Sequence, residues 1–189
     1  MARTVAYSMS MSLDGYIVGP DGRFDWSVPD DDVFQLALDE VRGADVHLLG
    51  RNLYETMLYW ETAGRAGVLD KKEREFADVW NHLRKVVFSR SLQSVTGTNT
   101  RLASGAVADE IERLTGEPGA GDIAIGGARL AASAAASGLI DEYRIRVYPV
   151  IVGGGVPFFP RAEQRTDLDL VEQRPFGSGV TYLRYRVAR

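Results

Sequence analysis

The chain has 189 residues, of which 45% are hydrophobic, and its 22 basic and 26 acidic residues give a formal net charge of −4. This size and composition are typical of one domain with a substantial core, and we expect a single domain over residues 1–189. Because the charge is modestly acidic and no dense block of lysine and arginine occurs, we expect neither a nucleic-acid partner nor a membrane-binding basic surface.

Features that would point to other classes of protein are missing from the sequence. No apolar run approaches the ~20 residues that span a bilayer, and the N-terminus lacks the charged-then-apolar order of a signal peptide. We therefore expect a cytoplasmic protein without a membrane partner. The chain has no cysteine, which excludes disulfides and thiolate metal ligands. Its two histidines, His47 and His82, lie far apart in sequence, and we expect no metal site.

The N-terminal part of the chain predicts a strand, a long loop and a helix. Residues 3–12 alternate between larger apolar side chains and small or polar ones, with the period of two that is typical of a strand. A loop with Asp-Gly and Gly-Pro-Asp-Gly turn signals then runs from Asp14 to about Pro29. Loops of this length are usually functional, and a lid over the site is one hypothesis. From Asp30 the apolar spacing is helical, with Gly43 as the expected end.

The middle of the chain alternates short apolar runs with amphipathic segments, which is the pattern of βα units. It predicts a mostly parallel sheet with helices on both faces. A polar, glycine-containing connection is expected after the helix that starts at Arg51. The expected elements are a strand at 46–49, a short helix from 51, a charged helix at 70–83, strands at 84–88 and near 100–103, a helix at 107–115, a strand at 122–125 and an alanine-rich helix at 130–137.

After residue 140 the helical alternation stops. A long strand is expected at 142–152, and strands at 168–174 and 180–187 are joined by a Phe-Gly-Ser-Gly turn that predicts a hairpin. The expected fold class is therefore α/β, with a mostly parallel mixed sheet that ends in an antiparallel C-terminal hairpin.

Three of the apolar runs end at a small or glycine residue and meet an arginine within a few positions. They lie in the segments 46–52, 86–91 and 123–129. The carboxyl ends of parallel strands are where open α/β sheets bind ligands. Glycine lets a phosphate approach the backbone, a helix start directs free N–H groups at it, and arginine adds a fork of donors. Three such ends on one sheet predict a long, multiply phosphorylated ligand such as a dinucleotide.

With these motifs, the chain resembles the dihydrofolate reductase-like superfamily, and most closely the reductase domain of bacterial bifunctional riboflavin-biosynthesis deaminase-reductases. The resemblance covers nearly the whole chain, because the motifs occur in the family's order and spacing at 12–17, 50–55, 89–90, 126–129 and 150–159. It implies a three-layer α/β/α fold, NADPH across the carboxyl ends of the central strands, and a homodimer joined through the C-terminal strands. The deaminase half needs cysteine-ligated zinc, so we expect a stand-alone reductase-like chain.

The resemblance also implies which residues hold NADPH. The pyrophosphate is held at two helix starts, formed by Gly50, Arg51, Asn52 and Leu53 and by Gly126, Gly127, Ala128, Arg129 and Leu130. The adenosine ribose lies near Ser89 and Arg90, and the nicotinamide carboxamide lies near Ser10 and Ile17. An arginine fork, from Arg51 or Arg90, gains more from the 2′-phosphate of NADPH than from the hydroxyl of NADH.

One position departs from the family pattern, because many relatives have threonine where this chain has Leu53. Loss of a hydroxyl that bonds a charged acceptor costs about 1.5–3 kcal/mol, which backbone amides at the same helix end partly offset. The run Gly153–Gly155 is expected to mark a tight crossing of backbones near the cofactor rather than another phosphate site, because no helix with a basic residue follows it.

Two aspartates are candidates for a catalytic role beside the nicotinamide. Asp14 ends the first strand, although Asp-Gly is also a turn signal. Asp31 follows Trp26 at the spacing by which dihydrofolate reductases present their pterin-binding carboxylate, although it also suits the dipole of a helix start. The nicotinamide performs hydride transfer, so the chain must orient the substrate and supply a proton.

Four aromatic residues are candidates for binding the substrate. Trp26 and Phe34 suit stacking on a flat heterocycle, and Tyr54 and Tyr148 suit the rim of the pocket, while each is equally suited to the core. The expected function is an NADPH-dependent reductase of a small planar heterocycle, either a ribosylaminopyrimidine phosphate of riboflavin synthesis or a pterin. The alternative is a non-catalytic NADPH-binding or regulatory protein on the same fold.

Overall fold

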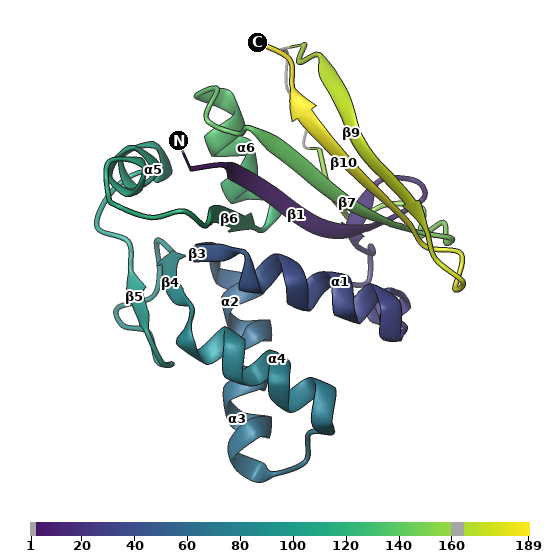
Figure 1. The fold of residues 1–189 in the computed structure, drawn as a ribbon, viewed down its shortest axis with the longest axis horizontal. Coiled ribbons are helices and arrows are strands. Elements are labelled where there is room, and N and C mark those ends of the chain that lie inside the picture. The colour runs from purple at the N-terminus through teal and green to yellow at the C-terminus, as the bar shows by residue number, and fades with distance from the viewer. Residues whose placement is uncertain (1–2, 160–164) are drawn as a thin grey trace.

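The computed structural model describes residues 3–159 and 165–189. An eight-stranded sheet forms its centre, with strand order β5-β4-β3-β6-β1-β7-β10-β9 (Figure 1). The parallel strands are β1 (Val5–Ser12), β3 (Ala44–Gly50), β4 (Arg84–Phe88), β5 (Thr100–Leu102), β6 (Asp122–Gly126) and β7 (Glu142–Tyr148). The antiparallel strands at one edge are β9 (Leu168–Pro175) and β10 (Thr181–Val187). The predicted fold class is confirmed.

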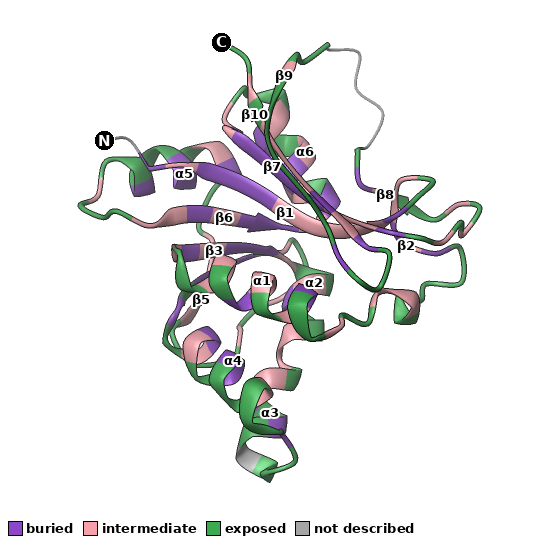
Figure 2. Cartoon of the chain, turned by 45° about the vertical axis from the view of Figure 1, so that its right-hand side comes forward, coloured by how far each residue is buried: buried purple, intermediate pink, exposed green. Residues whose placement is uncertain are grey.

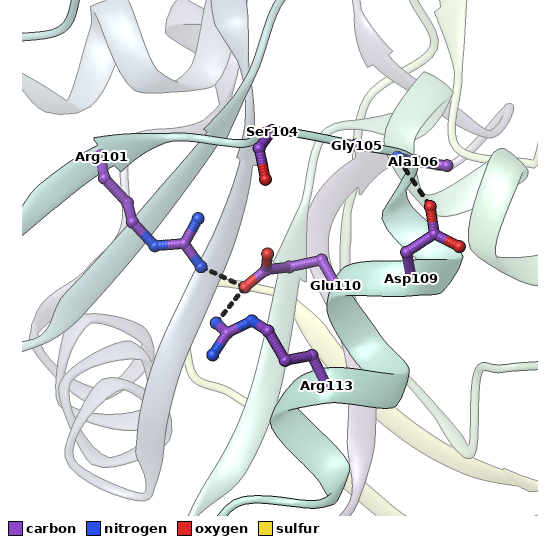
Figure 3. A pocket seen from close by; sticks show the side chains of 7 residues that line it. All are labelled: Arg101, Ser104, Gly105, Ala106, Asp109, Glu110 and Arg113. Atoms are coloured by element: carbon purple, nitrogen blue, oxygen red, sulfur yellow. Dashed lines mark hydrogen bonds and ion pairs between the residues drawn. The ribbon is translucent and has the colours of Figure 1, made fainter.

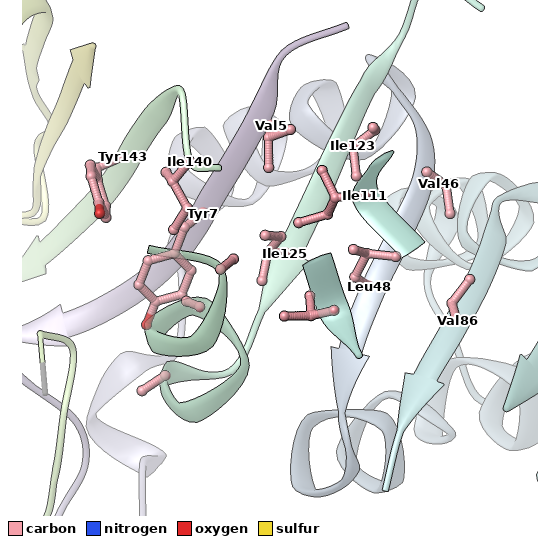
Figure 4. Packing of buried hydrophobic residues seen from close by; sticks show 14 of the residues in the cluster. Val5, Tyr7, Val46, Leu48, Val86, Ile111, Ile123, Ile125, Ile140 and Tyr143 are labelled. Carbon is pink, nitrogen blue, oxygen red and sulfur yellow. The ribbon is translucent and has the colours of Figure 1, made fainter. Parts of the chain in front are cut away.

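Helices cover both faces of the sheet, as predicted (Figure 1). On one face lie α1 (Asp31–Arg42), α2 (Arg51–Met57) and α4 (Lys71–His82), whose apolar sides pack against β3 and β4. On the other face lie α5 (Val107–Thr115) and α6 (Ala128–Ala136). Figure 4 shows the core on this second face, where Ile111 of α5 belongs to the same cluster as Leu48 and Ile125 of the sheet. These three layers are the α/β/α arrangement that the resemblance implies.

Local sequence signals explain where the helices begin and end. Asp30 caps α1 by accepting a hydrogen bond of 2.8 Å from the N–H of Val33, and Gly43 follows the last turn. A capping box of Asp70 and Glu73 starts α4. The side of α6 that faces the sheet is made of alanines, so this helix lies close to the strands. Among the described residues, none of the helices is both long and apolar enough to cross a bilayer.

The structure corrects the sequence prediction in the connections. The segment after α2, expected to be a plain connection, contains α3 (Tyr59–Ala66), which packs against α4 through Trp60 and Ala63. β7 ends at Tyr148 rather than continuing to Val152, because Pro149 has no N–H to extend the ladder.

The loop expected from Asp14 to Pro29 is partly ordered by pairing with a distant segment. It contains β2 (Tyr16–Val18), which pairs antiparallel with β8 (Val156–Pro157), and the short 3₁₀ helix η1 (Asp25–Ser27). Gly155 has a φ of +113°, and a Cβ there would overlap the carbonyl oxygen of Val18. The expected tight crossing of backbones at the glycine run is therefore confirmed, and it joins the loops that follow β1 and β7.

Candidate functional site

The three arginine-containing strand ends lie next to one another along one edge of the sheet. β4, β3 and β6 are neighbours and run parallel, with Gly50 paired to Phe88 and Leu49 paired to Gly126. Because parallel neighbours place their carboxyl ends at the same edge, segments far apart in sequence meet there. The predicted convergence of these strand ends is confirmed.

Two glycines bring the helix starts at this edge into close contact. A Cβ added to Gly127, whose φ is +103°, would lie 3.7 Å from both the Cα and the N of Gly50. α2 and α6 begin at these glycines, and neither helix start has a side-chain cap. The first N–H groups of both helices therefore have no side-chain acceptor of their own.

The arginines at this edge differ in how far they are already engaged. Arg51 pairs with Glu55, with 2.7 Å between Nε and Oε1, and donates from Nη1 to Ser91 Oγ at 2.8 Å, which links α2 to the loop after β4. Among the arginine side chains that the structure describes, only Arg90 and Arg129 make no ion pair, hydrogen bond or ring contact. Positive charge without an internal partner thus gathers where β4 and β6 end.

The remaining predicted cofactor residues differ in their surroundings. Ser89 Oγ accepts hydrogen bonds from the backbone N–H groups of Ser91 and Leu92, which shapes the turn after β4. Asn52 is exposed in the first turn of α2, and Ser10 is partly exposed on β1. Three of these predicted residues pack into the core on the face covered by α5 and α6, namely Ile17, Ala128 and Leu130.

Leu53 packs directly against Gly126, and a Cβ on this glycine would collide with the leucine Cδ2 atom. The same Cβ would lie 3.0 Å from Nε2 of His47, a ring nitrogen that is buried without a hydrogen-bond partner. Burial lowers the pKa of His47 to about 4, and the nearby charge of Lys85 adds to this shift. His47 is therefore a neutral imidazole beneath the end of β6.

Asp14 lies where β1 ends, but its carboxylate is used to hold another loop. It accepts hydrogen bonds from the N–H groups of Val152 at 3.1 Å and of Gly153 at 2.8 Å. The pKa of Asp14 lies below its usual value because of a hydrogen bond with Ser12 and these backbone donors. This lowered pKa keeps the carboxyl group of Asp14 ionised near neutral pH.

The structure turns Asp31 away from the sheet. Its side chain is 84% exposed and forms an ion pair of 2.7 Å with Lys72 of α4. Phe34 and Tyr54 belong to the core. Phe34 packs against aromatic rings of α3 and α4, and Tyr54 is buried between α2 and the loop after β4. These residues are not brought to the edge where the strands end.

Trp26 and Tyr148, by contrast, meet each other. Their rings pack edge to face with centroids 5.9 Å apart, in a cluster that also contains Val33 of α1 and Tyr182 of β10. The Nε1 atom of Trp26 is buried without a hydrogen-bond partner. Burial raises the pKa of Tyr148, so its hydroxyl stays protonated at neutral pH.

A partly exposed stretch interrupts the buried centre of the sheet beside this pair. Ser8–Met11 of β1 and Arg146–Val147 of β7 are partly exposed, although both strands lie well inside the sheet (Figure 2). We call these residues the β1–β7 window. Ser10 and Arg146 are paired in the strand register, so their side chains share the face that α1 covers.

Sequence reasoning missed the polar network at this window. Glu40 of α1 accepts from Ser8 Oγ at 2.7 Å, from Arg146 Nη1 at 2.6 Å and from the Tyr182 hydroxyl at 3.0 Å. Although burial opposes it, the charge of Arg146 and the hydrogen bonds keep the pKa of Glu40 below its usual value. The available signal was the alternation of serines on β1 and of arginines on β7, which is unusual for inner strands.

A cavity of about 220 Å³ lies between β5 and the start of α5 (Figure 3). β5 is the strand next to β4 in the sheet. Its two arginines, Arg101 and Arg113, both pair with the buried carboxylate of Glu110. Their charge is therefore partly compensated, unlike that of Arg90 and Arg129.

Within the described residues, no three histidine, aspartate or glutamate side chains are grouped so that they could hold a metal ion.

Residues 3–182 match the family model of the RibD C-terminal domain. The chain belongs to the RibD C-terminal domain family. Two curated relatives are uncharacterized proteins of Bacillus subtilis: YyaP is 30% identical over 184 residues, covering 97% of this chain and 94% of YyaP, and YwjB is 28% identical over 192 residues, covering 94% of each.

Solved structures place this RibD C-terminal domain protein beside others of the same fold. A putative riboflavin biosynthesis protein from Shewanella sp. PV-4 is 26% identical, covers 100% of both chains and has a TM-score of 0.76. A diaminohydroxyphosphoribosylaminopyrimidine deaminase/5-amino-6-(5-phosphoribosylamino)uracil reductase from Thermotoga maritima is 16% identical with a TM-score of 0.66, covering 99% of this chain and 57% of that one. The expected relation to the reductase domain of riboflavin-biosynthesis proteins is confirmed.

Proposed function

We propose that this protein is an NADPH-dependent reductase that transfers hydride to a small planar heterocycle. The observation that carries the proposal is the edge formed by β4, β3 and β6, where Gly50 and Gly127 approach each other and Arg90 and Arg129 lack internal partners. Membership of the RibD C-terminal domain family supports reductase chemistry. The Thermotoga neighbour is a 5-amino-6-(5-phosphoribosylamino)uracil reductase, which motivates a ribosylaminopyrimidine phosphate as the substrate, with a pterin as the second option.

The residues at this edge fit a dinucleotide phosphate. In the proposal, the pyrophosphate lies over Gly126 and Gly127, where glycine backbones and uncapped helix starts offer N–H groups. Arg90 binds the 2′-phosphate because its guanidinium is free, whereas Arg51 is already engaged by Glu55 and Ser91. The bound nicotinamide would supply the hydride.

The residues of the chain would orient the substrate and provide the proton. Ser10 is part of the β1–β7 window, and Tyr148 lies two residues after its strand partner Arg146, on the same face of β7. Because the Tyr148 hydroxyl stays protonated and Asp14 is held ionised, we assign the proton-donating role to Tyr148 rather than to Asp14. Trp26 packs against Tyr148 and limits the access of water to it.

Titration with NADPH tests the proposal. Tryptophan fluorescence and the melting temperature should both respond to NADPH, and more strongly than to NADH, because binding to the folded state stabilises it. NADPH oxidation should then be measured with ribosylaminopyrimidine phosphate, pterins and quinones. Absence of any NADPH effect on fluorescence and melting would rule the proposal out.

A non-catalytic NADPH-binding protein is the second candidate. The observation that favours it is the contact of Leu53 with Gly126, which puts an apolar group where many relatives carry a hydroxyl. NADPH binding without oxidation of NADPH by any compound in the panel would support this alternative.

A further inference from the structure

Exposed apolar side chains gather on two loop segments of the protein. The segments 13–28 and 151–159 carry six of the ten large apolar side chains that are exposed in the described part of the chain. We call these six residues the apolar rim; they are Leu13, Phe24, Val28, Ile151, Val156 and Phe159. Single exposed apolar residues are ordinary, but a group of them indicates a binding surface.

Backbone contacts hold the two segments of the apolar rim against each other. The N–H of Leu13 donates to the carbonyl oxygen of Val150 at 2.8 Å, and the N–H of Phe158 donates to that of Gly15 at 2.8 Å. β2 and β8 also pair, and they lie side by side in Figure 2. The apolar rim is therefore presented by ordered, paired segments.

The apolar rim borders the substrate side of the proposed site. Its two segments follow β1 and β7, the strands that carry Ser10 and Tyr148. Val150 packs in the same cluster as Trp26 and Tyr148, and the next residue, Ile151, is 72% exposed. A substrate bound beside Tyr148 would therefore have the apolar rim next to it.

The charge of these segments does not suit a phosphate group. The segment 13–28 contains one arginine and three aspartates, and the segment 151–159 contains no charged residue, which gives a net charge of −2. The arginine, Arg23, already pairs with Asp25. The guanidinium of Arg146 is likewise neutralised by its carboxylate partner on α1. A phosphate dianion would be repelled here, whereas an uncharged apolar group would remove apolar surface from water.

We propose that the apolar rim binds an uncharged apolar substituent of the substrate, so that the protein acts on alkyl-substituted planar heterocycles rather than on sugar phosphates. This inference rests on the proposed function and, of its two substrate options, favours the ring without a phosphate. Leu13 and Ile151 are the specificity-determining residues, because they are 63% and 72% exposed where the two segments meet.

A homologous series of ligands tests the inference. 6-Methylpterin, 6-propylpterin and 6-pentylpterin share one ring and differ only in the length of the alkyl chain. Their dissociation constants should be measured by calorimetry, with and without saturating NADPH. Affinity for the wild-type protein should rise about two- to fourfold with each methylene group that the apolar rim buries. A pterin with a phosphonopropyl chain at the same position should bind more weakly than 6-propylpterin.

Serine variants of the apolar rim identify the residues responsible. Leu13→Ser and Ile151→Ser, made separately, should each reduce the gain in affinity with chain length and leave the affinity for 6-methylpterin nearly unchanged. Both side chains are exposed, so the fold should tolerate either change. Val68→Ser is the matched control, since Val68 is 69% exposed in the connection between α3 and α4 and should not affect the series.

The outcomes separate this inference from the proposed function. If NADPH fails to bind the wild-type protein, the proposed function fails, whereas a gain with chain length that is lost in Leu13→Ser would still uphold the apolar rim. If NADPH binds but affinity does not rise with chain length, or the phosphonate binds more tightly, the inference is overturned. Sedimentation should show the same association state for the wild-type protein and Leu13→Ser. A wild-type dimer that this variant dissociates would overturn the inference, since a second copy would then cover the apolar rim.

Discussion

Leu53 of α2 lies against Gly126 at the end of β6, and the absence of a side chain on this glycine is what allows the contact. Gly126 and Gly127 together fix how closely α2 approaches the start of α6. The edge that we propose for the coenzyme therefore depends on backbone packing as much as on charged side chains.

Gly126→Ala should disrupt this packing. The added methyl group would push the side chains of Leu53 and His47 away from residue 126. Overpacking of this kind lowers the free energy of unfolding by about 1–3 kcal/mol. Urea unfolding would measure the loss, and NADPH affinity should fall with it. Gly177→Ala is the control, because a Cβ at Gly177 meets nothing within 4 Å. Equal stability of the two variants would contradict the packing argument.

Arg90→Gln should weaken NADPH binding by about tenfold and leave NADH binding nearly unchanged. The free guanidinium would lose a charge-assisted bond to the 2′-phosphate, which only NADPH carries. Titration of both dinucleotides measures the ratio. Arg165→Gln, which removes an exposed partner of Asp167 elsewhere, should affect neither. Parallel losses for both dinucleotides after Arg90→Gln would show that Arg90 does not contact this phosphate.

The sequence predicted the strand ends well because each depends on local signals. An apolar run, a glycine and an arginine are read within a few residues, and parallel pairing then brings the ends of β4, β3 and β6 together. The engagement of Arg51 also has a local cause, since Glu55 lies four residues along the same helix. Whether Arg90 has a partner depends on tertiary contacts and was not predictable.

The Glu40–Arg146 pair could not be predicted from local pattern. Its members are 106 positions apart, and a glutamate on an amphipathic helix is typical of a solvated surface. Likewise, the partner of Asp14 lies 138 positions away, so the Asp-Gly signal indicated a turn but not its anchor. Long-range pairing of polar groups decides their roles, and composition or periodicity carries little information about it.

Asp14→Ala should loosen the loop after β7 without abolishing turnover. The variant loses the acceptor for the N–H groups of Val152 and Gly153, so limited proteolysis should cut this loop faster. Asp21→Ala, which removes only a local turn bond to Arg23, serves as the control. A loss of about 10²–10⁴-fold in NADPH oxidation, the usual effect of removing a general acid, with unchanged proteolysis would instead make Asp14 the proton donor.

His47 should make the folded state less stable as the pH falls below neutrality. Its pKa is about 4 in the folded protein, against about 6.5 when unfolded, so between these values the unfolded chain binds more protons. The contribution of neutral His47 to the free energy of unfolding is therefore present above pH ~6.5. It is lost as the pH falls, by about 2 kcal/mol between pH 7 and pH 5. Urea unfolding at both pH values would measure this, and His47→Gln should remove most of the difference. His82→Gln should retain it, because His82 is exposed. If His82→Gln removed the difference and His47→Gln did not, the buried imidazole would not be the group that titrates.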